Sequence, residues 1–142
     1  NGFIGHEFIM DVSEFKKIGI SEKDISKRLI DYSFNPTKMS WSRQGILMFE
    51  PTQSESKEEL DRLILALKYI RKELKDIENN PNLIGNNLLT NSPHPISLIK
   101  DWKYDYSMKE AFFPVKSLEK EKFWPNVERI DDVNGNRELL KL

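Results

Sequence analysis

The clearest hydrophobic pattern lies in the middle of the chain, between residues 60 and 77. Apolar side chains recur there at spacings of three and four, which is the repeat of one face of an α-helix. Ser56 and Glu59 stand before this stretch at the spacing of a helix-capping box. The pattern therefore predicts an amphipathic helix over 56–77, about six turns long. We expect its core face to pack on a sheet through Leu63, Ile64, Leu67, Ile70 and Leu74.

Three shorter segments before this helix have the character of strands. Residues 8–12 form a short apolar strand candidate, and residues 38–41 form a weaker one. Ile46–Phe49 is a continuous apolar run, which is typical of a buried strand, and Glu50-Pro51 ends it.

A second helix is predicted between the first two strand candidates. Residues 21–24 (Ser-Glu-Lys-Asp) can form a capping box, and Ile25, Leu29 and Ile30 then fall on one side of the helix. Asn35-Pro36 is expected to end it, because the residue before a proline is driven out of the helical conformation.

The chain changes character after the long helix. Residues 79–95 are rich in Asn, Pro, Ser and Gly, as loops are, and a short helix is predicted over 97–102. Beyond it the chain is aromatic and punctuated by proline, in a composition better suited to packing than to water. We therefore divide the chain into a core over 1–80 and a loop-rich extension over 81–142, which packs on that core or on a larger parent domain.

The order strand, helix, strand, strand, helix predicts the fold class α/β (α+β). We expect a two-layer sandwich in which helices cover one face of a small mixed sheet. The aromatic side chains left over favour an accessory domain docked on a larger body. Because the chain starts at Asn1 rather than at methionine, we interpret it as a fragment of a longer protein.

Composition excludes several classes of function. The 22 lysines and arginines are balanced by 23 acidic residues, so no positive surplus is present for a nucleic acid or an anionic membrane. The chain has no cysteine, which excludes disulfides, thiolate nucleophiles and cysteine metal sites. No apolar run approaches the roughly 20 residues that a membrane span requires. We expect neither nucleic acid nor membrane as a partner.

Candidate catalytic groups are few. His6 is more commonly a structural group at such a position. His94 lies between two prolines that fix the backbone, and the sequence leaves a functional ring and an exposed turn histidine equally open. The two histidines make no metal signature, and the hydroxyls of Thr52 and Ser54 lack an acyl-transfer motif. Asp131-Asp132 point to opposite faces in extended structure, which suits caps or ion pairs.

Segments along nearly the whole chain resemble those of glycine decarboxylases, in the same order. Gly5–Asp11 is similar to the family's Gly-His-Glu-Phe-Ile-Leu-Asp, and Lys27–Phe34 is similar to its Lys-Arg-Leu-x-Asp-Tyr-x-Phe. Further matching segments are Pro36–Trp41 with one insertion, Leu47–Glu55, Glu59–Arg62, Asp76–Glu78, Ser92–His94, Tyr106-Ser107, Ala111, Phe113-Pro114, Lys122–Pro125 and Arg129–Val133.

The resemblance implies the small C-terminal domain of a fold-type I pyridoxal-phosphate enzyme. The cofactor and its Schiff-base lysine then belong to a missing upstream domain, and no catalytic, cofactor-binding or metal residue is expected in this chain, which should be inactive alone. In that family the cofactor withdraws electrons while glycine loses carbon dioxide, and the aminomethyl group passes to the lipoyl arm of the H-protein. The implied partners are the upstream domain, the lipoylated H-protein and a dimeric or αβ assembly. The implied compartment is the bacterial cytoplasm or the mitochondrial matrix.

Small domains of this fold offer their strand ends and following loops to the cofactor cleft. The side chains that we therefore expect to face the cleft are Glu50, Thr52, Ser54, His94 and Arg43. Arg43 departs from the family, which has apolar residues and proline before that strand, and we favour a surface position for it.

Other departures leave a rival hypothesis open. Met108 stands where the family has an arginine, and Gln53 and Asn134 also differ from its pattern. The loss of the matched arginine at Met108, together with Arg43, favours as the alternative a non-catalytic interaction or regulatory module derived from the same fold.

Overall fold

The structure is a computed structural model that describes residues 5–39 and 43–130. Within these residues the strands are β1 (Phe8–Asp11), β2 (Lys38–Met39) and β3 (Ile46–Phe49). The α-helices are α1 (Glu22–Asp31), α2 (Lys57–Asn79) and α3 (Met108–Phe112). Short 3₁₀ helices lie at Ser13–Ile18, Pro81–Leu83, Ile96–Ile99 and Lys116–Glu119.

The three strands form one sheet in the order β1-β3-β2, and both pairings are antiparallel. The prediction of a mixed sheet was therefore wrong. Residues 40–45, which connect β2 to β3, are too few for the crossover that a parallel pair requires. The register places Phe8 opposite Phe49 and Met10 opposite Leu47, so these apolar side chains share the face that packs on the core.

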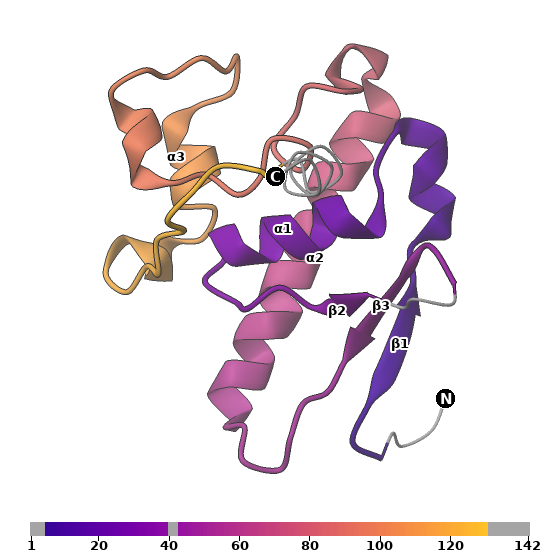
Figure 1. The fold of residues 1–142 in the computed structure, drawn as a ribbon. Helices are drawn as coiled ribbons and strands as arrows, with labels where there is room; N and C mark the ends of the chain where they lie inside the picture. Colours follow the sequence, from indigo (N-terminus) through magenta and orange to yellow (C-terminus); the bar gives the residue numbers. More distant parts are fainter. Residues whose placement is uncertain (1–4, 40–42, 131–142) are drawn as a thin grey trace, which may run out of the picture.

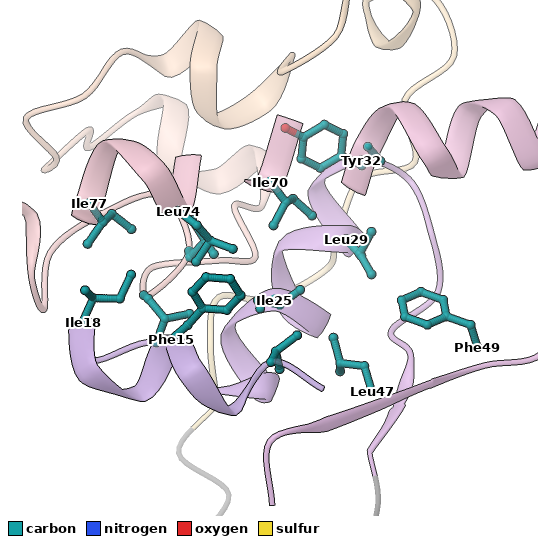
Figure 2. Packing of buried hydrophobic residues seen from close by; sticks show 14 residues of the cluster. Phe15, Ile18, Ile25, Leu29, Tyr32, Leu47, Phe49, Ile70, Leu74 and Ile77 are labelled. Atoms are coloured by element: carbon teal, nitrogen blue, oxygen red, sulfur yellow. The ribbon is translucent and has the colours of Figure 1, made fainter. Parts of the chain in front are cut away.

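Helices cover one face of the sheet, which confirms the predicted α/β (α+β) class. Helix α1 packs against β2 and β3, while α2 packs against α1 and the 3₁₀ helix at 13–18, which we call the 13–18 turn. Figure 2 shows Phe15 and Ile18 of that turn meeting Leu74 and Ile77 of α2, with Leu29 between α2 and the sheet.

The predicted core face of α2 was correct in part, but the observed buried face is rotated away from Ile64. Ile70 and Leu74 are buried as expected, but the side chain of Ile64 is 50% exposed and Ala66 is buried. Leu63 and Leu67 are only partly buried against the core. The buried line runs through Ala66, Ile70, Leu74 and Ile77, and α2 makes contacts with α1 and with the 13–18 turn.

Both predicted helix starts are confirmed. The Ser21 backbone N–H donates to the Asp24 carboxylate at 2.7 Å, and the Ser56 hydroxyl accepts from the Glu59 N–H at 3.1 Å. Helix α1 ends at Asp31, earlier than Asn35-Pro36, and the chain turns away through Ser33 in a left-handed conformation with φ 62°.

Two shorter elements also differ from prediction. The helix expected over 97–102 is a 3₁₀ helix at Ile96–Ile99. The strand expected over 38–41 is observed at Lys38–Met39, and the rest of it lies outside the described residues, as do Asp131, Asp132 and Asn134.

The described part of the extension lies beside α1 and α2, on the side away from β1 (Figure 1). A second apolar cluster forms there around Leu98, Ala111 and Phe112. Aromatic side chains surround it: Trp102, Tyr104, Tyr106, Phe113 and Trp124. Leu89 of the extension is buried in the main core, so apolar contacts join the two parts. The boundary at residues 80 and 81 stays a prediction. No helix in the described ranges is long and apolar enough to cross a membrane.

Candidate functional site

A cluster of polar side chains is buried where α1, α2 and the extension meet. We call it the buried polar cluster, and its members are the buried Arg28, Asp31, Ser92 and His94 together with the partly buried Glu73. Asp31 is the last residue of α1, and the 92–94 segment belongs to the extension. Buried charges are costly unless they are paired and hydrogen-bonded, so the partners of each group decide what the cluster can do.

The carboxylate of Asp31 binds three other members of the cluster. Its Oδ1 accepts from the His94 backbone N–H at 2.7 Å, and its Oδ2 lies 2.7 Å from His94 Nδ1. Ser92 Oγ donates to Oδ2 at 2.9 Å, and Arg28 Nη1 donates at 3.0 Å. Burial alone would raise the pKa of Asp31, but the His94 hydrogen bonds and the Arg28 charge outweigh it and lower that pKa. The carboxylate is therefore ionised.

The guanidinium of Arg28 uses all five of its N–H donors. Nε and Nη2 bind the Glu73 carboxylate of α2 at 3.0 and 2.8 Å. Nη1 donates to Asp31 and to the Ala111 carbonyl at 3.1 Å, and Nη2 also donates to the Glu110 carbonyl at 2.8 Å. Burial would lower the pKa of Arg28, yet the two carboxylates raise it. One fully buried side chain thus ties α1 to α2 and α3.

The ring of His94 is fully buried and engaged at both nitrogens. An ionised carboxylate only accepts, so Nδ1 donates to Asp31, and Nε2 lies 2.8 Å from the Tyr106 hydroxyl. Trp102 and Tyr104 flank the ring, with centroids 6.2 and 5.8 Å away. A carboxylate-oriented histidine is the arrangement of many general bases, but here the second nitrogen has no open position for a substrate. The geometry supports a structural role.

Lys122 and its neighbour fasten the extension to the end of α1. Lys122 Nζ donates to the Asp31 carbonyl at 2.7 Å and lies 5.2 Å from the centre of the Trp124 ring. The Phe123 backbone N–H donates to Ser33 Oγ at 2.9 Å. Burial lowers the pKa of Lys122 to about 8. The ammonium donates to a carbonyl oxygen that has no intrahelical partner, because Asp31 is the last residue of α1.

A groove lies beside the same helix end, between α1, β3 and the start of α2. We call it the acidic groove, and its volume is about 530 Å³. Its apolar lining includes Phe34, Phe49, Leu60, Leu63 and Phe123. Three carboxylates, those of Glu50, Glu55 and Glu59, line it together with the ammonium of Lys38.

The five side chains expected at the cofactor cleft lie in four places. Glu50 lines the acidic groove, and Thr52 and Ser54 lie on the following exposed loop, where their hydroxyl oxygens are 2.6 Å apart. Arg43 is exposed and pairs with Asp11 at 3.1 Å. His94 belongs to the buried polar cluster and does not line the groove. Whether any of them faces a cofactor cleft stays a prediction.

Sequence reasoning missed Arg28, Asp31 and Glu73. Charged residues on an amphipathic helix usually face water, yet Arg28 and Asp31 flank the core residue Leu29 on α1. The available signal was the family resemblance, because the cluster draws residues from the Lys27–Phe34 and Ser92–His94 segments. These matching segments, far apart in sequence, are brought together in the fold.

Whether any described residue contacts pyridoxal phosphate stays a prediction. Lys122 has the low pKa of a Schiff-base lysine, but its Nζ is bound to the Asp31 carbonyl and no glycine-rich loop lies after a strand nearby. Gly45 approaches the backbone of Ser13 rather than an open cradle. Across the described ranges, no group of three or more His, Cys, Asp or Glu side chains is placed to hold a metal.

Comparison with known proteins gives consistent matches. The family model described as glycine dehydrogenase, C-terminal domain, matches residues 1–94. The chain is 48% identical over 143 residues to glycine dehydrogenase (decarboxylating) 1, mitochondrial, of Arabidopsis thaliana, covering 99% of this chain and 14% of that protein. It is 47% identical over 142 residues to glycine dehydrogenase (decarboxylating) of Dechloromonas aromatica, covering 98% of this chain and 15% of that protein. The chain thus spans about one seventh of these relatives.

Proposed function

This chain belongs to the glycine dehydrogenase (decarboxylating) family, and on that premise we propose that it forms the C-terminal domain of an enzyme that decarboxylates glycine. In the proposed enzyme, pyridoxal phosphate is bound by an upstream domain, and the aminomethyl group passes to the lipoyl arm of an H-protein. The observation that carries the proposal is the 47–48% identity over 98–99% of the chain. We propose a dimeric or αβ assembly, in the cytoplasm of a bacterium or the mitochondrial matrix of a eukaryote.

The part that we assign to this domain is positioning rather than chemistry. Arg28 connects three helices, and Asp31 connects α1 to the 92–94 segment, so the extension is held in one orientation on the core. Such a fully bonded network fixes a unique packing, because any other arrangement leaves a buried charge unpaired. We infer that this packing holds the acidic groove and the loop after β3 in a fixed orientation toward the upstream part of the enzyme.

The loop that follows β3 is the segment that we assign to the cleft. Thr52 and Ser54 are exposed, and Pro51 restricts the backbone before them. Hydroxyls on such a loop can position a substrate without reordering. Glu50 is retained as a candidate for the same side, and Arg43, which pairs with Asp11 at the other end of β3, is retained as a separate candidate. For His94 the burial of its ring favours an indirect role, through the position of the extension.

Carboxyl exchange between glycine and labelled bicarbonate tests the proposal in the complete polypeptide that carries this chain. The expected result is exchange that requires pyridoxal phosphate and is stimulated by lipoylated H-protein. The rival function is a non-catalytic module, and the observation that favours it is Met108, which stands where the family has arginine. Met108 is the first residue of α3 and is 37% exposed. An upstream sequence without a Schiff-base lysine would favour that rival.

A further inference from the structure

We propose that the acidic groove is a docking site for a segment of the preceding part of the glycine dehydrogenase polypeptide, one that carries a lysine or arginine next to apolar side chains. This inference rests on the proposed function, because the occupant is the remainder of that enzyme. It concerns the groove between α1, β3 and α2, and not the buried polar cluster.

The shape of the groove suits an apolar anchor. Phe34, Phe49, Leu60 and Leu63 contribute apolar lining, and Phe123 lines it from the extension. The Phe123 side chain is 65% exposed, which is costly for an aromatic ring in water. An exposed apolar surface rimmed by polar groups is typical of an interaction site.

The backbone that presents Phe123 is held in place from two sides. Its own N–H donates to Ser33 Oγ at 2.9 Å, and the neighbouring Lys122 ammonium donates to the Asp31 carbonyl. The exposed ring therefore stands on an ordered support rather than on a free chain end. A preorganised aromatic side chain loses little conformational entropy when a partner covers it, which favours binding.

The charges around the groove define the chemistry of its occupant. Glu50 pairs with Lys38 at 2.9 Å, and Glu59 pairs with Arg62 at 2.6 Å. No lysine, arginine or histidine of the described residues forms a salt bridge with Glu55. A cation brought by the occupant would complete this set of charges, and apolar neighbours of that cation would cover Phe123.

The preceding part of the same polypeptide is the occupant that the comparisons favour. The matched model describes a C-terminal domain, and the chain covers 14–15% of its relatives, so most of such an enzyme precedes it. Because the upstream part of the polypeptide is covalently linked to this chain, its effective concentration at the groove is high, and a groove with modest apolar area is enough to bind it.

Photo-cross-linking in the complete polypeptide tests the assignment. We would place benzoylphenylalanine at position 123, irradiate the purified enzyme, and identify the linked peptides by mass spectrometry. The expected product links position 123 to a peptide upstream of residue 1 that contains a lysine or arginine beside apolar residues. The same group at position 84, an exposed isoleucine outside the groove, should not give that product.

Charge reversal supplies a matched comparison. Glu55→Arg should lower the yield of the expected product by about threefold or more, the scale of an exposed ion pair turned repulsive. Glu58→Arg, on the adjoining first turn of α2 but outside the groove, should leave it unchanged. Links confined to this chain, links to a separate protein, or no links overturn the docking proposal. If any of these results is found and exchange activity persists, the docking proposal is contradicted and the proposed function is not. The expected link in a polypeptide without exchange activity contradicts the proposed function alone.

Discussion

Asp31 and His94 lie 63 positions apart and meet through two contacts of 2.7 Å, one from the His94 backbone N–H and one from its ring Nδ1. Both side chains are fully buried, and Arg28 and Ser92 share the same carboxylate. The histidine is thus a partner of a buried anion that joins the extension to α1. Loss of this histidine should therefore lower the free energy of unfolding, and any loss of activity should follow from that instability.

We predict that His94→Ala lowers the free energy of unfolding by about 2–4 kcal/mol, because Asp31 loses a buried partner and the ring leaves a cavity. This replaces the expectation of a cleft loop, for which stability would be unchanged. Urea denaturation followed by circular dichroism measures it, with the exposed His6→Ala variant as the control. A cost below about 0.5 kcal/mol, the usual surface value, would contradict the structural role.

The rotation of α2 can be tested by a pair of isoleucines. Ile70 is 2% exposed, so Ile70→Ala should cost about 2–5 kcal/mol of unfolding free energy through lost burial and a cavity. Ile64 is 50% exposed, and Ile64→Ala should cost less than about 1 kcal/mol. Equal costs in denaturant titrations would show that the helix presents a different face to the core.

Lys122 gives the domain a predicted dependence on alkaline pH. Its pKa is about 8 in the fold against an ordinary 10.5, because burial disfavours the ammonium. Between these values the unfolded chain holds more protons, so the stability contributed by this group rises with pH. We expect wild type to gain on the order of 1–2 kcal/mol relative to Lys122→Met from pH 8 to 10.5, less than the full shift since solvent screens a partly exposed group. A parallel pH course for the two proteins would refute the shift.

Thr52 tests the assignment of the loop after β3. In the complete enzyme, Thr52→Ala should lower glycine–bicarbonate exchange by about tenfold, as loss of a positioning group does. Stability should hardly change, because the hydroxyl is exposed and contacts only Ser54 among the described side chains. The exposed Ser97→Ala variant, on the 96–99 helix, is the matched hydroxyl control. Full exchange activity in Thr52→Ala would return the loop to a purely structural role.

Local signals in the sequence predicted the local elements. The Ser56 cap, the Ser21–Asp24 box and the Ile46–Phe49 run depend on neighbours in sequence, and each appears in the fold. The rotation of α2 was missed because the burial of Ala66 rather than Ile64 depends on how the helix packs on the rest of the core, which no helical period specifies. The antiparallel pairing of β1 with β3 depends likewise on contacts across the fold.

The polar site could not be predicted from residue type. Arg28 and Asp31 carry charges that usually face water, and only α2, α3 and the 92–94 segment together supply the partners that make their burial stable. The same holds for Lys122, whose pKa is lowered by burial against the end of α1, a contact that its neighbours in sequence do not specify. The family resemblance located these segments without indicating that they meet.

We propose that this chain is a positioning domain of a glycine dehydrogenase whose cofactor is bound by the upstream domain. Glycine–bicarbonate exchange, measured with pyridoxal phosphate and lipoylated H-protein, tests it on two samples: the complete polypeptide and this chain alone. We expect exchange by the complete polypeptide and none by the chain alone. Exchange by the chain alone, or a complete polypeptide that is folded, loaded with cofactor and inactive, would contradict it.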